Sequence, residues 1–167
     1  MDQNTQLINT ITTFLKDIGL ETVMQPIEGA GFVPGISLNN GRLIIDTSQL
    51  KYTGDIIYAA GRLAVMPPEE RVAMDDIIPK TDMQQSGGIM AIAWAYAACI
   101  HLGLDPHVVF HDGGYDGQSE ALISHFRDTP QWGIPMLQWC GMTYDARNAA
   151  QLNKLPFPHM QSWVREK

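Results

Sequence analysis

The chain has 167 residues, of which 45% are hydrophobic and 17% are charged. This size and composition are typical of one folded globular domain, so we predict a single domain over residues 1–167. The net charge of −7 excludes a general nucleic-acid binder, because such a protein needs a basic surface that replaces the counterions of the phosphates.

The first part of the chain is predicted to form a helix followed by a β-hairpin. Apolar residues recur at i, i+3 and i+4 spacing, so residues 4–18 should form an amphipathic helix that ends at Gly19. The dipeptide Asn40-Gly41 favours a type I′ turn, because both residues tolerate positive φ angles. Residues 42–46, with the sequence RLIID, have the composition of a strand.

Two further helices are predicted in the middle of the chain. Residues 54–65, GDIIYAAGRLAV, form the first of them, and Pro67-Pro68 ends it. Ser86 can cap the second, which extends to about Leu102 and is apolar nearly all round. A helix of that kind usually lies at the centre of a domain.

The C-terminal part mixes short elements with loops. Residues 107–110 are predicted to be extended, residues 111–117 (HDGGYDG) a glycine-rich loop, and residues 118–126 a helix. Residues 133–142 are predicted to be extended and residues 158–166 a closing helix. The whole chain is therefore expected to be α+β, a small sheet with a β-hairpin packed against a layer of helices.

The helix over residues 54–65 carries a polar stripe. On a helical wheel, four residues lie opposite its aliphatic face: Asp55, Tyr58, Ala59 and Arg62. Tyr58 and Arg62 are neighbours at i and i+4. Two interpretations stay open: the stripe faces solvent, with Arg62 stacked on Tyr58, or a neighbour approaches the small residues of this helix closely. Since Arg62 lies opposite the core face, its truncation is expected to leave no cavity.

The segment RLIIDTSQLKYTGDIIYAAGRLAV, residues 42–65, resembles the strand, connection and helix of small zinc-peptidase-like proteins of the ImmA/IrrE type, and the resemblance covers roughly residues 35–100. In that family the helix carries His-Glu-x-x-His. Its two histidines hold one zinc ion and its glutamate acts as general base. The resemblance aligns these three positions with Tyr58, Ala59 and Arg62.

The family's third zinc ligand, an acidic residue on a following helix, aligns near residues 87–90, where this chain has no carboxylate. The resemblance therefore implies a zincin-like minimal core without catalytic residues, metal or cofactor. It implies a non-catalytic, metal-free homologue that binds a peptide, protein or small anion. The residual groove would be formed by Asp55, Tyr58, Ala59 and Arg62.

A working hydrolase is an alternative. His101, His107 and His111 are close in sequence and could form a relocated metal site, with Cys99 or Asp112 as a further ligand. Their spacing matches no standard zinc pattern.

A structural or assembly role is a third hypothesis. Trp132, Trp139 and Trp163 lie near the C-terminus and could form an interface in a homo-oligomer. The longest apolar run, about 14 residues up to Ile100, is shorter than the about 20 residues of a membrane span. The first ten residues show no pattern of a signal peptide. We therefore expect a cytoplasmic protein with no membrane partner, whose ligand is an unknown peptide or protein.

Overall fold

The computed structural model describes all 167 residues and has the predicted α+β fold. Its elements, in chain order, are α1 (Gln3–Asp17), β1 (Thr22–Met24), β2 (Ile36–Asn39), β3 (Arg42–Ile45), α2 (Asp55–Ala64), α3 (Pro68–Arg71), α4 (Asp82–Leu102), the 3-10 helices η1 (Pro106–Val108) and η2 (Tyr115–Gly117), α5 (Ser119–Asp128), α6 (Ile134–Trp139) and α7 (Ala146–Leu152).

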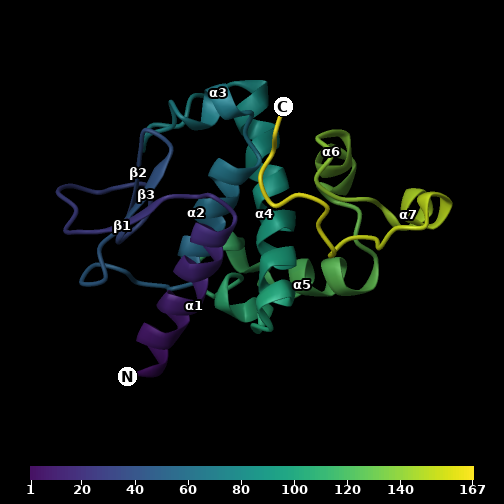
Figure 1. The fold of residues 1–167 in the computed structure, drawn as a ribbon. Coiled ribbons are helices and arrows are strands. Elements are labelled where there is room, and N and C mark those ends of the chain that lie inside the picture. The colour runs from purple at the N-terminus through teal and green to yellow at the C-terminus, as the bar shows by residue number, and fades with distance from the viewer.

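Helix α4 runs through the middle of the molecule, with α1, α2 and the sheet on one side and α5, α6 and α7 on the other (Figure 1). Every residue from Met90 to Cys99 except Ile92 is buried, which confirms α4 as the central helix. The helix begins earlier than predicted, because the side chain of Thr81 rather than that of Ser86 caps it. None of the helices combines the length and apolar composition needed to cross a membrane.

The sheet has three strands in the order β1-β3-β2. The predicted hairpin is confirmed: β2 pairs antiparallel with β3, and Asn40 and Gly41 have φ angles of 50° and 75°. Strand β1 was not predicted, since three residues are too few for a periodic pattern. It pairs parallel with β3, with Thr22 opposite Leu43. The sheet is therefore mixed.

Three predictions for the C-terminal part are wrong. Residues 107–110 begin in the 3-10 helix η1, because the Asp105 side chain accepts a hydrogen bond from the His107 N–H and turns the chain. Residues 133–142 contain α6, which starts after Gly133 with a proline in its first turn, a favoured arrangement. A short apolar run does not distinguish strand from helix without such a start signal.

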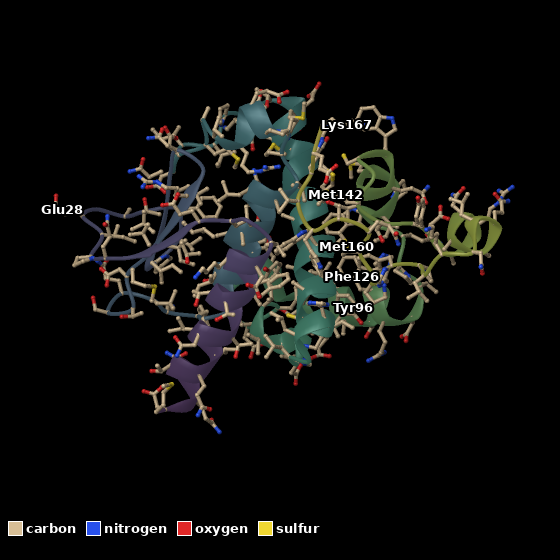
Figure 2. The ribbon with its side chains drawn as sticks, in the orientation of Figure 1. Glu28, Tyr96, Phe126, Met142, Met160 and Lys167 are labelled. Carbon is tan, nitrogen blue, oxygen red and sulfur yellow. The ribbon has the colours of Figure 1, made fainter.

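The expected closing helix over residues 158–166 is instead an irregular tail. Its backbone bonds to distant segments rather than to itself: the Gln161 N–H donates to the Met142 carbonyl at 2.8 Å, and the Arg165 N–H to that of Ala64 at 2.8 Å. Met142 and Met160 are both buried where the tail passes α4 (Figure 2). The tail therefore joins one continuous apolar core that starts at α1.

Asp46, directly after β3, anchors the loop that precedes β2. Its carboxylate accepts hydrogen bonds from the Ser48 hydroxyl at 2.6 Å, from the Ile27 N–H at 3.0 Å and from the Gln49 amide at 2.7 Å. The Ser48 hydroxyl and then the Ile27 N–H stabilise the ionised form. Together with the other hydrogen bonds they lower the pKa of Asp46 from 3.8 to about 2.

This depressed pKa predicts an acid-dependent loss of stability. Ionised Asp46 stabilises the fold fully above its ordinary pKa, and this contribution is lost as the pH falls toward about 2. We expect Asp46→Asn to lower the free energy of unfolding at neutral pH and to flatten its pH dependence between pH 4 and pH 2. Urea denaturation at several pH values measures both effects. Glu28→Gln, at the exposed tip of the same loop (Figure 2), is the control. An unchanged pH profile in Asp46→Asn would contradict this assignment.

Candidate functional site

A cavity of about 430 Å³ lies at the N-terminal end of α2, between the segment before β2 and the glycine-rich loop before α5. We call it the α2 pocket. Two of the four predicted groove residues, Asp55 and Tyr58, line it. The full set of lining residues is Val33, Pro34, Lys51, Tyr52, Asp55, Tyr58, Ile92, His111, Gly113, Gly114 and Tyr115.

A carboxylate and an imidazole meet in this pocket. Nε2 of His111 lies 2.7 Å from Oδ1 of Asp55, and their side chains are 13% and 15% exposed. Asp55 is the first residue of α2, and His111 follows the buried Phe110. The two residues are 56 positions apart in sequence, so this pair exists only because the chain brings η1 back to the start of α2.

The surroundings of His111 indicate which form of its ring is present. Its Nδ1 atom is buried and has no hydrogen-bond partner. A second proton on Nδ1 would create a buried, charged donor without an acceptor, which costs more than the unpaired neutral acceptor that the uncharged ring leaves there. We therefore assign the neutral imidazole with its hydrogen on Nε2, donated to Asp55. In this form the negative charge of Asp55 is not neutralised.

Three tyrosines surround the Asp55–His111 pair. Tyr52 stacks on the His111 ring with centroids 3.6 Å apart and planes 8° apart. The Tyr115 ring stands across the other two rings, at 85° to Tyr58 and at 69° to His111, with centroid distances of 6.4 and 6.2 Å. Burial, followed by the nearby Tyr58 and Asp55, raises the pKa of Tyr115, so its hydroxyl stays protonated.

The glycines of the loop over residues 111–117 make room for these rings. A Cβ on Gly113 would overlap the side chain of Tyr52. Tyr115 and Asp116 themselves take positive φ angles of 61° and 51°, an uncommon conformation for residues with side chains. The loop is therefore shaped around the Tyr52–His111 stack.

Arg62 and Ala59, the other two predicted groove residues, do not line the pocket. Arg62 is 9% exposed, and its Nη2 donates to the carbonyl and side-chain oxygens of Gln84 at 3.1 and 3.3 Å. Ala59 is completely buried. The expectation of a solvent-facing stripe at Arg62 is therefore wrong, as is the expectation that its truncation leaves no cavity. Helix α4 covers this side of α2.

Small residues allow α2 and α4 to lie close together, which confirms the second interpretation of the stripe. A Cβ on Gly61 would lie 3.1 Å from the carbonyl oxygen of Ala91, and one on Gly88 would lie 2.6 Å from Nη1 of Arg62. Position 62 thus faces position 88, while Tyr58 and Ile92 line the same pocket. The two helices run antiparallel, and positions 58 and 62 of α2 both lie toward α4.

The three histidines of the alternative metal site lie in separate environments. His101 packs beside the Phe14 ring at a centroid distance of 5.4 Å, His107 lies on the surface between two carboxylates, and His111 is in the α2 pocket. Burial raises the pKa of the Cys99 thiol to about 12, so it is not a ready ligand. The structure contains no group of three or more His, Cys, Asp or Glu side chains placed to hold a metal ion.

The three tryptophans of the C-terminal part are also separated. The Trp163 carbonyl accepts a hydrogen bond from Nε1 of Trp94 at 2.9 Å, so this residue helps to bind the tail to α4. Trp132 and Trp139 are exposed, to 42% and 83%.

Searches with this chain find no matching protein-family model, curated protein or solved structure. The resemblance to ImmA/IrrE-type proteins therefore rests on the residues of the segment 42–65 and on the geometry of α2 and α4.

Sequence reasoning missed the pocket's other side chains. It considered His111 only as a metal ligand, and it assigned no role to Tyr52, Tyr115 or Lys51. Short-range patterns contain no signal for Tyr52, which lies in the connection before α2. The only clue was the glycine-rich loop after His111, since consecutive glycines mark places where another group approaches the backbone closely.

Burial of Arg62 predicts a structural effect of its truncation. We expect Arg62→Ala to lower the free energy of unfolding by about 2–4 kcal/mol, because it leaves a cavity between α2 and α4. Arg62→Met should cost less, since it fills the space and removes a buried cation that has no carboxylate partner. Urea unfolding measures both variants, with the fully buried Leu63→Ala as reference. Wild-type stability of Arg62→Ala would refute the assignment.

Proposed function

We propose that this protein is a non-catalytic, metal-free homologue of ImmA/IrrE-type zinc peptidases, and that its α2 pocket binds a small molecule or a side chain of a peptide. The observation that carries the proposal is that positions 58 and 62 of α2 both face α4, with an open pocket at the first of them. This placement supports the arrangement expected from the resemblance, with two ligand positions on one helix and a third on the next.

The residues at these positions argue against a zinc site. Zinc in proteins takes histidine, cysteine or carboxylate ligands, and a catalytic site has three of them. Here the corresponding positions hold Tyr58, Arg62 and Gly88, and the guanidinium of Arg62 lies against Gly88. A fixed cation at this place repels a divalent metal ion. The position of the general base is Ala59, whose methyl group has no acid–base chemistry.

The pocket has the size and lining of a binding site. Its volume of about 430 Å³ is in the usual range for sites that hold small ligands. Three tyrosines and His111 contribute aromatic rings to its lining, and Asp55 provides a polar group that fixes orientation. The binding surface that we propose therefore keeps Asp55 and Tyr58, adds His111 and Tyr115, and no longer includes Arg62.

A hydrolase remains the second candidate, because a carboxylate that orients a histidine also occurs in acyl-transfer enzymes. In those enzymes the other ring nitrogen accepts a proton from a nucleophile. Here that nitrogen, Nδ1 of His111, is buried, and no serine, threonine or cysteine lines the pocket. These contacts favour binding over catalysis.

We also propose that the protein is cytoplasmic, since Cys99 and Cys140 are free thiols.

A fragment screen by protein NMR tests the binding function. We expect fragments that bind to shift the resonances of Tyr58, Tyr115 and His111. Val33→Trp should fill the pocket and abolish these shifts, and the same substitution at Val72, which is 63% exposed, is the matched control. A screen in which no fragment perturbs the pocket residues would reject this function.

Restoring the metal ligands tests the family relationship. We expect wild-type protein to contain no stoichiometric zinc by elemental analysis. Tyr58→His with Arg62→His supplies two ligands, and Gly88→Glu adds a third opposite position 62. The triple variant should bind zinc at least about tenfold more tightly than the double variant, and zinc should raise its melting temperature. Ala59 is left unchanged, because it is fully buried and is not a ligand position.

The control for this experiment places the carboxylate one residue further along α4. Ile89 lies on a different side of the helix, where its carbonyl would be 3.1 Å from a Cβ on Gly133. Ile89→Glu in the double-histidine background should therefore add no zinc affinity. Equal affinities of the two triple variants would mean that α2 and α4 do not form the family's site, and the relationship would be rejected.

A further inference from the structure

We propose that the ligand of the α2 pocket is an alkylammonium cation, either a free amine or the side chain of a lysine in a peptide. This inference rests on the proposed binding function of the pocket, and it specifies the ligand's chemistry. The sequence suggested a small anion as one possible ligand. Arg62, the one cation of the predicted groove, is buried outside the pocket, so a cationic ligand fits better.

The carboxylate of Asp55 gives the pocket a negative charge. Its only hydrogen-bond partner is Nε2 of His111, at Oδ1, and the second oxygen, Oδ2, accepts no hydrogen bond from the protein. With His111 in its neutral form, the carboxylate keeps a full negative charge in a mostly buried position. An ammonium N–H can donate to Oδ2 and neutralise this charge, which a neutral or anionic ligand cannot do.

Aromatic rings border the same space as this carboxylate. Tyr58 and Tyr115 stand nearly perpendicular, with centroids 6.4 Å apart, and the stacked Tyr52–His111 pair borders the same cavity. Ring faces carry partial negative charge and attract ammonium groups within about 6 Å. The rings of three tyrosines and His111 line one cavity next to a carboxylate, which suits a cation with an alkyl stem.

Lys51 is a cation of the protein itself that already lies against one of these rings. Nζ of Lys51 lies 5.4 Å from the centroid of the Tyr52 ring, at the edge of the pocket. The rim thus already holds one ammonium group by the interaction that we infer for the ligand. With His111 neutral, Lys51 is the only cationic residue in the lining, whereas the adjoining loop carries two acids, Asp112 and Asp116. A bound cation would be repelled by Lys51, and this repulsion can be measured.

The test compares three probes of the same chain length: n-butylammonium, n-butanol and butyrate. NMR titration of the wild-type protein should show that n-butylammonium shifts Tyr58, Tyr115 and His111 and binds at least tenfold more tightly than the other two. A capped tripeptide with a central lysine, titrated in parallel, distinguishes the two sources: tighter binding than n-butylammonium indicates a peptide, and weaker or equal binding indicates a free amine.

Three single substitutions give matched changes of charge. Asp55→Asn removes the charge but keeps an oxygen that accepts the His111 N–H, so it should weaken n-butylammonium binding at least tenfold with little change in folding. Lys51→Met removes the competing cation and should strengthen binding severalfold. Glu28→Gln, at an exposed loop tip (Figure 2), removes one negative charge that does not belong to the pocket lining and should leave binding unchanged.

The outcomes separate this inference from the binding function. If n-butanol or butyrate binds as tightly as n-butylammonium, the pocket does not select a cation. If Asp55→Asn binds the cation as well as wild type, the carboxylate does not recognise it. Either result overturns the inference. The same holds if fragments of other chemistry occupy the pocket and n-butylammonium does not. In each of these cases the pocket still binds ligands. Only a fragment screen without any pocket ligand would reject the binding function itself.

Discussion

The close packing of α2 on α4 is the constraint on which the rest of the structure depends, because it sets both the centre of the core and the position of the pocket. Gly61 and Gly88 allow this packing, since a side chain on either would meet the other helix. Ile92 of α4 then lies beside the N-terminal half of α2 and closes one side of the cavity. The sheet and α1 cover the opposite side of α2 (Figure 1).

The two ends of α2 have opposite charges, which matches the helix dipole. Asp55, at the N-terminal end, is stabilised by the partial positive charge of the first turn. At the C-terminal end, Arg62 belongs to the last turn, and Nε of Arg71 donates to the Leu63 carbonyl at 3.0 Å. The guanidinium of Arg62 itself bonds to the oxygens of Gln84 on α4. The helix dipole therefore favours the carboxylate of Asp55 at one end of α2 and the cation of Arg71 at the other.

Under the proposed relationship, the chemistry of the site has moved by about one turn of α2. The space near position 62 is filled by an internal cation, whose Nε atom has no hydrogen-bond partner. The accessible space is at positions 55 and 58, where His111 contributes from a distant segment. The close packing limits what can replace Arg62, because a substitute must fill the same volume between α2 and α4.

Local patterns were sufficient for the α+β fold and for α1, α2 and the hairpin, because helical periodicity and the Asn40-Gly41 turn are properties of neighbouring residues. They also placed Asp55 and Tyr58, which line the α2 pocket, on one side of α2. Local patterns failed where contacts between distant segments determine the conformation of a segment or the burial of a side chain. The tail over residues 158–166 is not a helix, because its N–H groups find acceptors on other segments. Arg62 is buried because α4 covers it, and the partner of Asp55 lies 56 residues away. Burial and pairing of this kind depend on which segments meet in space, and a one-dimensional pattern does not contain that information.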